Sequence, residues 1–446
     1  MAGLTQPIPY PINRPFHEPD WRRFPGWSRA TRQEWENALW QRRNSVKSVM
    51  ALKAVLGSYL PDDLAAGIEQ DQRQAAVMPL LITPQMINTM QERDLWNDPV
   101  RRYMLPAIQD RHPQWPSHPL AQRDSLHETE MWAIESLTRR YPTKVMAELL
   151  SSCPVYCGHC TRMDLVGGST PLVNKRVFRL PLRRRLEGIL RYLRENSSVR
   201  DVTVSGGDIV NLAPARLEDF IGALMDIASI RDIRLDSKAL IALPQHFFQK
   251  EVIHSLGRLA RKARKRRISL AWHTHINHAN QITPLVARAA RQLLDMGFRD
   301  VRSQGVLLRG VNATAKELLE LCFTMLDQAQ IIPYYFYMCE MIPGCEHWRV
   351  SIHEAQRLQH DIMGYLPGFA TPRIVCDVPL LGKRWVSQCR EYDRERGISY
   401  WTKNYRTPIE GDDPQALTRR YAYYDPLHTL PAQGQRYWLK RTAGSV

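Results

Sequence analysis

The chain has 446 residues and is strongly basic, with 61 lysines and arginines against 45 aspartates and glutamates. It can bury a large core, and its 44% hydrophobic and 24% charged residues are typical of a globular protein. No apolar run is long enough to span a bilayer and Met1 to Pro7 lack the pattern of an export signal, so we expect a cytoplasmic protein without membrane association.

Residues 1–125 predict an N-terminal arm followed by a helical extension. Residues 1–30 contain prolines and aromatic residues without a sustained period, whereas residues 31–110 follow a helical pattern. Three prolines between residues 111 and 123 indicate a loop. The helical pattern is interrupted at Pro61, Pro79, Pro84 and Pro99.

Beyond about residue 140, short apolar segments alternate with helical patterns, which is typical of parallel strands joined by crossover helices. Polar motifs repeatedly follow the strands, as in barrel enzymes. We therefore predict an α/β fold with a partial (β/α)6 TIM-type barrel over residues 126–385 and a C-terminal extension over residues 386–446. The expected strands are Val145–Leu150, Val202–Val204, Ile268–Trp272, Val301–Leu307, Ile331–Tyr337 and Arg373–Cys376.

Capping signals mark two of the intervening helices. Thr283 followed by Pro284 predicts the start of a helix, and Gly297 predicts its end. Thr314 with Glu317 predicts a capping box at the start of a second helix.

The densest basic run is Arg258–Arg267, which also contains Leu259, Ala260 and Ala263. Apolar residues at this spacing point to one buried helix face. We therefore interpret the run as a solvated helix face and not as a nucleic-acid site. The net charge of +16 also suits anionic small molecules.

Three of the eight cysteines lie close together in Cys153-Pro-Val-Tyr-Cys157-Gly-His-Cys160, directly after the first expected barrel strand. A disulfide framework would spread its cysteines through a short secreted chain. Three thiolates can hold three irons of a [4Fe–4S] cluster and leave the fourth open, whereas structural zinc closes four ligands. His159 could complete a zinc set, but it lies between two of the ligands. We therefore predict a cluster on these three cysteines.

The C-x3-C-x2-C spacing resembles that of the radical S-adenosylmethionine superfamily. The resemblance implies that the open iron chelates S-adenosylmethionine and that reduction releases a 5′-deoxyadenosyl radical. Ser205-Gly206-Gly207-Asp208, at the end of the next expected strand, is similar to the superfamily's Gly-Gly-Glu-type motif for the methionine amine. Without this context a Gly-Gly-Asp sequence is most often a turn.

Further segments resemble lysine 2,3-aminomutase and its relatives, in consistent order over roughly residues 80–385. The resemblance implies an isomerase that uses pyridoxal 5′-phosphate, an amino-acid substrate, an electron donor such as flavodoxin or ferredoxin, and a homo-oligomer. The segments are Leu137–Pro142, Cys160–Arg162, His273–His278, Gln304–Asn312, Pro333–Tyr335, Glu346–His347 and Asp377–Lys383.

Lys383 follows Gly382 just beyond the last expected strand, where a lysine can form a Schiff base with pyridoxal phosphate. Without the resemblance, a surface lysine would be the better interpretation. Lys144 stands where relatives have a second phosphate-binding arginine, which keeps the charge but loses the bidentate fork. The resemblance assigns pyridoxal phosphate binding to Arg140, Tyr141, Lys144, Gln304 and Lys383.

The resemblance also suggests how a substrate binds. Arg162 is expected to grip the substrate carboxylate and His275 to lie near the adenosyl group. Relatives that bind lysine present two aspartates to its distal ammonium, where this chain has Asp377 and Glu340. Both are negative, so we expect a basic amino acid, lysine first and arginine second. An acidic substrate would bury like charges together.

The chain departs from its relatives in the turn before Lys383. The sequence Pro379-Leu380-Leu381-Gly382 replaces a run of glycines and is one residue shorter. Glycines permit positive φ angles and close backbone approach, so we expect this turn to follow another path. The cysteines that bind structural zinc in some relatives are missing, and we expect no such zinc.

These features predict a 2,3-aminomutase that moves the α-amino group of a basic L-amino acid to the β-carbon. One alternative is elimination or dehydrogenation on the same scaffold, because the turn before Lys383 is altered. Another is a basic RNA-binding or RNA-modifying protein. The sequence lacks the interleaved aromatic and basic residues that stack single-stranded bases, which argues against the last alternative.

Overall fold

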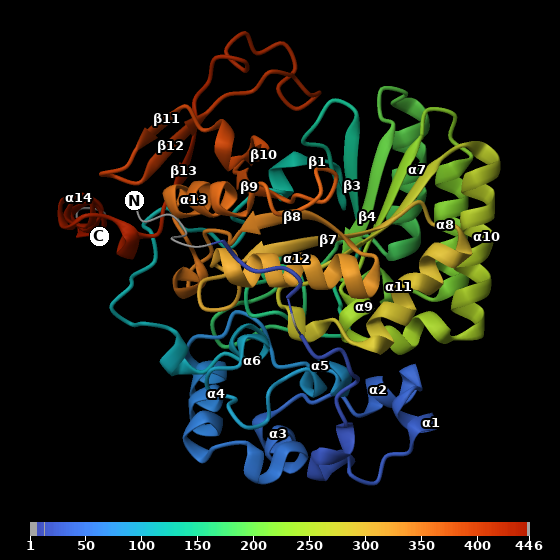
Figure 1. Cartoon of the computed structure of the whole chain (residues 1–446). Helices are drawn as coiled ribbons and strands as arrows, with labels where there is room; N and C mark the ends of the chain where they lie inside the picture. The colour runs from blue at the N-terminus through green and yellow to red at the C-terminus, as the bar shows by residue number, and fades with distance from the viewer. Residues whose placement is uncertain (1–6, 13, 444–446) are drawn as a thin grey trace.

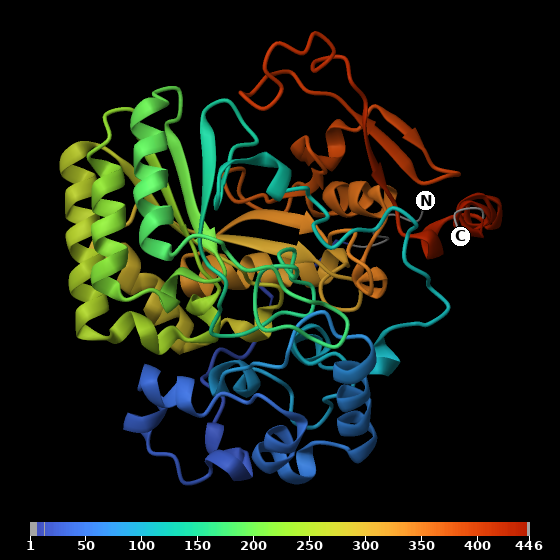
Figure 2. The same cartoon turned by 180° about the vertical axis from the view of Figure 1, so that it is seen from behind.

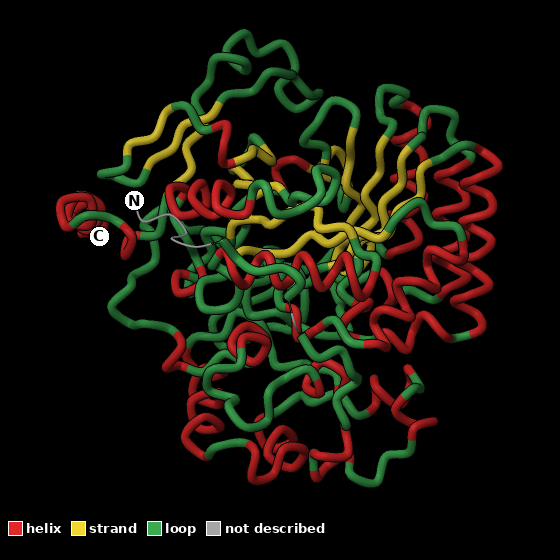
Figure 3. The backbone as a smooth tube through the Cα atoms, in the orientation of Figure 1, coloured by secondary structure: helices red, strands yellow, loops and turns green. Residues whose placement is uncertain are grey.

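A ten-stranded sheet forms the centre of the structure, a computed structural model that describes residues 7–12 and 14–443. The expectation about an export signal concerns residues that lie largely outside this range. Figure 3 shows the strands in yellow, arranged in an open curve. Neighbouring strands pair in parallel from β3 to β9, and β1, β2 and β10 are antiparallel at the two edges. The strands are β1 (Trp132–Ile134), β2 (Leu137–Thr138), β3 (Lys144–Leu150), β4 (Asp201–Gly206), β5 (Asp232–Asp236), β6 (Ser269–Thr274), β7 (Val301–Leu307), β8 (Ile332–Met338), β9 (Arg373–Val378) and β10 (Gly382–Trp385).

Six crossover helices connect the parallel strands in sequence order, so the expected α/β fold with an open, barrel-like sheet is confirmed. The parallel part has one strand more than six strand–helix units require. Figures 1 and 2 show these helices on the outer side of the sheet. They are α7 (Leu182–Glu195), α8 (Pro214–Met225), α10 (Lys250–Arg266), α11 (Pro284–Met296), α12 (Ala315–Ala329) and α13 (Ile352–Ile362), and the short α9 (Ala239–Ala242) follows β5.

Strand β5 was not among the expected strands. Its sequence alternates charged and apolar residues, and only Ile233 and Leu235 are buried in the core. Arg234 and Asp236 line the inner face of the sheet. The strand is therefore half polar because its second face borders a cavity.

The predicted helix caps are present at α11 and, in part, at α12. The Thr283 side chain accepts a hydrogen bond from the Val286 amide, and Gly297 ends α11 with a φ of 101°. At α12, the Thr314 side chain accepts from the Glu317 amide. The Glu317 carboxylate accepts from the Thr314 hydroxyl at 2.9 Å, so the reciprocal half of the capping box uses the side chain.

The basic run on α10 forms a solvated helix face, as predicted. Leu259, Ala260 and Ala263 are buried under it. Arg258 pairs with Glu218 at 2.6 Å, and Lys262 pairs with Asp226 of the segment after α8 at 2.8 Å. These charges are thus partly offset by the neighbouring helix.

The N-terminal helices lie below the sheet in Figure 1. Here Pro61 precedes one helix, and Pro84 and Pro99 each occupy the first turn of another, where a missing N–H costs nothing. Residues 111–123 contain no helix or strand, which confirms the expected loop. The helices are α1 (Arg32–Trp35), α2 (Ala38–Arg43), α3 (Val49–Leu56), α4 (Asp62–Gln74), α5 (Pro84–Asn88) and α6 (Pro99–Met104).

The C-terminal extension forms a second, three-stranded antiparallel sheet beside the first. Its own small core contains Ile398, Leu427, Leu430 and Trp438. Asp425 accepts a hydrogen bond from the Ile352 amide of α13 at 2.8 Å, which fixes the extension to the barrel. Its elements are β11 (Glu391–Asp393), β12 (Ile398–Trp401), β13 (Tyr421–Tyr424) and α14 (Ala432–Ala443).

One hydrophobic core joins the N-terminal helices to the sheet, with Trp35, Leu64 and Trp272 among its members. The boundaries 1–125, 126–385 and 386–446 therefore stay a prediction. In the part of the chain that the structure describes, no helix combines the length and apolar character needed to cross a membrane.

Candidate active site

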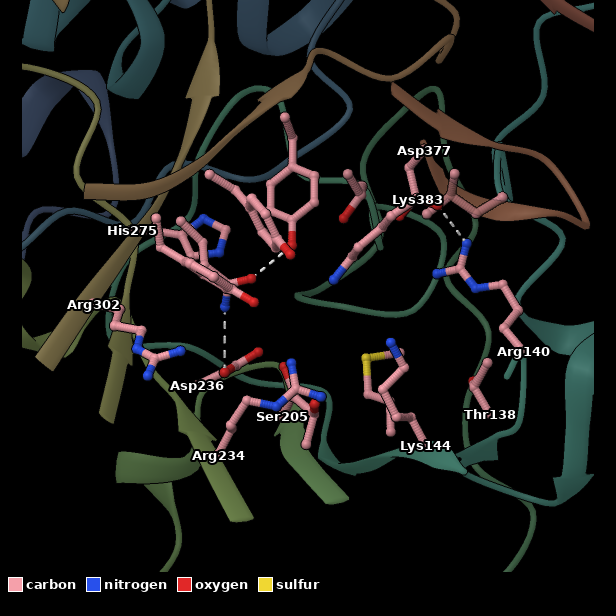
Figure 4. Close-up of a pocket in the computed structure, with 18 of the residues that line it drawn as sticks. Thr138, Arg140, Lys144, Ser205, Arg234, Asp236, His275, Arg302, Asp377 and Lys383 are labelled. Atoms are coloured by element: carbon pink, nitrogen blue, oxygen red, sulfur yellow. Dashed lines mark hydrogen bonds and ion pairs between the residues drawn. The ribbon is translucent and has the colours of Figure 1, made fainter. Parts of the chain in front are cut away.

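A cavity of about 310 Å³ lies on the inner side of the curved sheet. Residues from β3 through β10 line it, and Figure 4 shows charged side chains pointing into it from several strands. Of the residues predicted to bind a cofactor or the substrate, ten line this cavity. They are Arg140, Tyr141, Lys144, Arg162, Ser205, His275, Gln304, Glu340, Asp377 and Lys383.

The cysteine loop leaves the carboxyl end of β3. Cys153, Cys157 and Cys160 are free thiols and half-buried. Backbone carbonyls of the N-terminal extension hold the loop, because the Tyr156 amide donates to Leu81 O at 2.9 Å and the Gly158 amide to Tyr103 O at 3.0 Å. The three cysteines themselves do not line the cavity, whereas His159, Thr161 and Arg162 of the same segment do.

The Gly-Gly-Asp motif lies at the end of β4, against the chain that enters the cysteine loop. A Cβ atom at Gly207 would come within 2.5 Å of the Ser152 carbonyl oxygen, so only glycine allows this contact. The buried Asp208 carboxylate accepts hydrogen bonds from the amides of Val210 at 3.1 Å and Lys238 at 2.9 Å. The motif therefore joins the loops after β3, β4 and β5.

Ser205 and His275 line the cavity, whereas Gly206, Gly207 and Asp208 of the motif do not. Burial, with Lys238 next in effect, lowers the pKa of His275 to about 3, so its imidazole is neutral. As ligands of S-adenosylmethionine these residues stay a prediction.

Lys383 lies on β10 directly opposite Asp377 of β9. Its amine points into the cavity, with Nζ 5.0 Å from the centre of the Tyr337 ring. Burial lowers the pKa of Lys383 to about 8, while the charge of Asp377 opposes the shift. A larger fraction of this amine is therefore neutral near pH 8 than for a lysine in water.

The turn before Lys383 is held by Tyr141. The Lys383 amide donates to Tyr141 Oη at 2.8 Å. Gly382 has a φ of 98°, and a Cβ atom there would lie 2.5 Å from the same oxygen. Leu380 has a φ of 62°, so a non-glycine residue takes a left-handed conformation in this turn. That the turn follows another path than in relatives stays a prediction.

Arg140, one of the expected cofactor-binding residues, is paired with an expected substrate-binding residue. Its Nη1 donates to Asp377 Oδ1 at 2.7 Å, as Figure 4 shows, and its Nη2 lies 3.6 Å from Glu128. Glu340 is buried beside this pair, and burial followed by the charge of Asp377 raises the pKa of Glu340 well above its ordinary value. This end of the cavity is therefore rich in carboxyl groups, and Glu340 holds its proton more readily than a carboxyl in water.

Arg162 lies between two carboxylates. Its Nε is 2.9 Å from both Glu128 and Glu148, and its Nη2 is 3.2 Å from Glu128. These two carboxylates raise the pKa of Arg162 against the opposing effect of burial. The guanidinium is thus fixed in place at the side of the cavity closest to the cysteine loop.

A hydrogen-bonded network that the sequence reasoning missed surrounds Gln304. Gln304 Nε2 lies 2.8 Å from His273 Nδ1 and 3.5 Å from Asp236 Oδ1, and the Tyr337 hydroxyl donates to Gln304 Oε1 at 2.6 Å. The network fixes the amide of Gln304 beside Lys383. The alternation of charged and apolar residues in β5 was the signal that could have identified Asp236.

Positive charge gathers where the amino ends of the strands border the cavity. Lys144 Nζ lies 4.3 Å from the centre of the Tyr141 ring, and Arg234 forms a forked pair with Asp201 at 2.9 Å. Arg302 lines the same region. Burial and then Arg234 lower the pKa of Lys144, which indicates a surplus of cations there.

Comparison with known proteins decides the family. Over 352 residues the chain is 30% identical to an L-lysine 2,3-aminomutase of Fusobacterium nucleatum, a match that covers 78% of this chain and 76% of that protein. The chain belongs to the lysine 2,3-aminomutase family. It is therefore an isomerase that transfers an amino group within one molecule.

Other curated members of this family are similar at comparable coverage. An L-lysine 2,3-aminomutase of Clostridium subterminale is 29% identical over 80% of this chain and 79% of that protein. A glutamate 2,3-aminomutase of Clostridioides difficile is 24% identical over 78% and 76%. A solved radical SAM methyltransferase of Sphaerobacter thermophilus matches with a TM-score of 0.34 and 15% identity, over 57% of this chain and 70% of that chain. No protein-family model matches the chain.

Membership of the family implies three cofactors, a [4Fe–4S] cluster, S-adenosylmethionine and pyridoxal 5′-phosphate. The cysteine loop fits the first. Burial and then the charges of Asp208, Cys160 and Cys157 raise the pKa of Cys153. Among the described residues, no three His, Cys, Asp or Glu side chains lie close enough to share one metal ion. Three thiols on one loop match a cluster that leaves one iron open, whereas structural zinc normally takes four protein ligands.

His159, the other possible zinc ligand, is used elsewhere. Its Nε2 lies 3.1 Å from Asn277 Nδ2 in a buried contact, and its ring packs against Tyr103 and Trp348. The cavity also fits pyridoxal phosphate, since it presents the Lys383 amine for the aldehyde together with other cationic side chains for a phosphate. These residue assignments stay proposals.

Proposed function

We propose that this chain moves the α-amino group of a basic L-amino acid to its β-carbon in a pyridoxal phosphate-dependent reaction, with lysine as first choice and arginine as second. The observation that carries the proposal is that one cavity receives both the Lys383 amine and Arg162, which lies two residues after the last cysteine of the cluster loop. A radical formed at the cysteine loop and an amine bound at Lys383 would then act on a substrate in the same cavity.

Pyridoxal phosphate, when bound, supplies an aldehyde that bonds an amine and a ring that delocalises an adjacent radical. Lys383 is the residue we propose to hold it, because its lowered pKa of about 8 makes its amine a better nucleophile. Tyr141 orients the lysine through the amide hydrogen bond of 2.8 Å. Arg140, Lys144 and Gln304 offer cationic and amide groups on the walls of the same cavity.

The cluster and S-adenosylmethionine, when bound, supply the radical that abstracts hydrogen. Cys153, Cys157 and Cys160 are the residues we propose as iron ligands. The carbonyl groups of Leu81 and Tyr103 fix the loop that carries them and cover it from the N-terminal side. A covered loop limits the access of water to a reactive intermediate.

The charges of the cavity support a basic substrate. Glu340 and Asp377 are buried close together and their mutual repulsion is only partly offset by Arg140. An ammonium or guanidinium group between them would relieve this repulsion. Arg162 is the group we propose to bind the substrate carboxylate.

The test is anaerobic incubation of the reconstituted protein with L-lysine or L-arginine, a reductant and S-adenosylmethionine. We expect β-amino acids by chromatography against standards and by mass spectrometry. If neither amino acid is converted and S-adenosylmethionine stays intact, the proposal is wrong.

Elimination or dehydrogenation remains the alternative on the same scaffold, because Leu380 alters the turn beside Lys383. A substrate deuterated at the β-carbon separates the two outcomes. A mutase returns the label to the product, whereas elimination or dehydrogenation gives an unsaturated product. We also propose a small acidic electron donor such as flavodoxin or ferredoxin, and a homo-oligomer, which light scattering would reveal.

A further inference from the structure

The middle of β3 contains a buried carboxylate that the proposed function does not use. Glu148 is 2% exposed and lies opposite Ser205 of β4. Its Oε1 accepts from Arg162 Nε at 2.9 Å and its Oε2 from Trp132 Nε1 at 2.9 Å. A buried carboxylate is costly unless it is paired, so Arg162, the cation bonded to its carboxylate, largely determines whether Glu148 can stay charged.

Arg162 is shared, because Glu128 approaches the same guanidinium. Glu128 accepts from Arg162 Nε at 2.9 Å and from Nη2 at 3.2 Å. Two carboxylates therefore face one guanidinium, and Arg140, which lies 3.6 Å from Glu128, is already bonded to Asp377. With both glutamates ionised, this group of three carries a net negative charge before any substrate arrives.

The carboxylate of an amino-acid substrate would be the third negative group at Arg162. Carboxylates that share one site cannot all ionise at neutral pH, and the least solvated one takes up a proton. Glu148 is the more buried of the two glutamates. Its second oxygen, held by the Trp132 N–H, also faces away from the cavity that Glu128 lines.

The other groups around Glu148 do not remove this surplus of negative charge. Arg185 of α7 donates to the Glu148 backbone carbonyl at 3.0 Å, and the Glu148 amide donates to Ser136 O at 2.8 Å. Neither hydrogen bond involves the carboxylate, and Arg185 acts on it only through the distance-dependent attraction of its charge. Burial and then Glu128 raise the pKa of Glu148 to about 7, against the effects of Arg162 and Trp132.

We propose that Glu148 is a specificity-determining residue that carries a proton whenever the substrate carboxylate is bound to Arg162. The proton comes from solvent and bonds to a carboxylate oxygen of Glu148, and it returns to solvent when the substrate leaves. No electron is transferred. This inference rests on the proposed function, because it needs a substrate with a free carboxylate.

The inference fixes the sign of the pH dependence. Below the pKa of about 7, Glu148 is already protonated and binding does not depend on its titration. Above this pH, Glu148 must take up a proton each time a substrate carboxylate binds. The dissociation constant of the substrate therefore rises by up to about tenfold per pH unit. Ligands that have the same amines but no carboxylate show no such rise.

The experiment is anaerobic calorimetry on the holoenzyme between pH 6.5 and 8.5, in two buffers with different ionisation enthalpies. The probes are L-lysine and L-arginine, each compared with its decarboxylated form, 1,5-diaminopentane and agmatine. We expect uptake of up to one proton for the amino acids beyond that for the amines. The dissociation constant of the amino acid should rise about tenfold between pH 7.5 and 8.5.

Glu148→Gln keeps the shape of the side chain but cannot titrate, so it should remove both the extra proton uptake and the pH dependence. Glu195→Gln, an exposed position on α7, is the matched control and should behave as the unchanged protein. Glu128→Gln leaves Glu148 alone with Arg162, so the pH profile should move to lower pH and the proton uptake near pH 7.5 should fall.

The outcomes separate this inference from the proposed function. If a basic amino acid binds the holoenzyme without extra proton uptake, or if Glu148→Gln keeps the pH dependence, the inference is wrong and the proposed function stands. If neither amino acid binds at any pH, the proposed function fails and the inference fails with it. Where Glu148→Gln does not fold, the unchanged protein and Glu128→Gln still decide the question.

Discussion

Replacing Gly382 with alanine tests whether the turn before Lys383 shapes the cavity. Gly382 has a φ of 98°, which L-residues rarely adopt, and the added Cβ would lie 2.5 Å from Tyr141 Oη and 2.9 Å from Cζ. Tyr141 is also the group that accepts the Lys383 amide hydrogen bond. The substitution therefore strains the backbone and displaces the tyrosine that orients the lysine.

The expected cost has two parts. A non-glycine residue at such a φ costs about 1–3 kcal/mol. Loss of the hydrogen bond between Lys383 and Tyr141 adds about 1 kcal/mol. Gly364 is the matched control, because its φ is 88° but no atom lies within 4 Å of a Cβ built there. Gly364→Ala should show the first cost alone.

The assay is urea unfolding of both variants, together with titration of pyridoxal phosphate followed by absorbance. We expect Gly382→Ala to lose at least about 1 kcal/mol more free energy of unfolding than Gly364→Ala. Only Gly382→Ala should bind pyridoxal phosphate more weakly. Equal losses of stability and unchanged binding in the two variants would refute the reasoning.

Three further predictions follow from the same region and from the cysteine loop. The rate at which pyridoxal phosphate bonds to Lys383, followed by stopped-flow absorbance, should rise with pH through about 8 and level off above it, because only the neutral amine reacts. Asp377→Asn should move this rise to lower pH, because the charge of Asp377 raises the pKa of Lys383. Lys383→Ala should abolish the bond. In urea unfolding, Leu380→Gly should stabilise the protein by up to about 1 kcal/mol, because it relieves a φ of 62°. Leu381→Gly should destabilise the protein by several kcal/mol, because Leu381 is fully buried. The opposite order of stabilities would contradict the turn geometry. Cys157→Ala should lose iron and the visible absorbance of the cluster but keep pyridoxal phosphate, and Cys389→Ala, a half-buried cysteine outside the loop, should keep both.

The fold could be predicted where a strand contains a run of mostly apolar or small residues. Strands β3, β4, β7 and β9 match expected segments because helices cover one side and the barrel interior the other. Strand β5 could not be recognised in the same way, since Arg234 and Asp236 place charge at every second position. The polar face with which β5 borders the cavity also removes its hydrophobic signature.

The candidate site could be predicted where the chemistry is local in sequence. The cysteine spacing and the lysine after Gly382 are read from a few adjacent residues. The pairing of Arg162 with Glu128 and Glu148 could not be found, because it joins residues 34 and 14 positions apart that meet only when β3 packs against the preceding loop. Tyr141 and Gly382 are 241 positions apart, and only the folded chain brings them into contact.

The Tyr405 hydroxyl donates to the carbonyl of Leu381 at 2.9 Å, and Arg384 donates to that of Thr402 at 3.2 Å. The chain after the barrel thus returns to contact the hairpin of β9 and β10 that carries Lys383. A shortened form of this protein, or a design that transfers its strands to another scaffold, therefore has to include the segment that contains Thr402 and Tyr405. Removal of this segment would loosen the hairpin that carries Lys383, although Tyr405 lies more than twenty residues away in sequence.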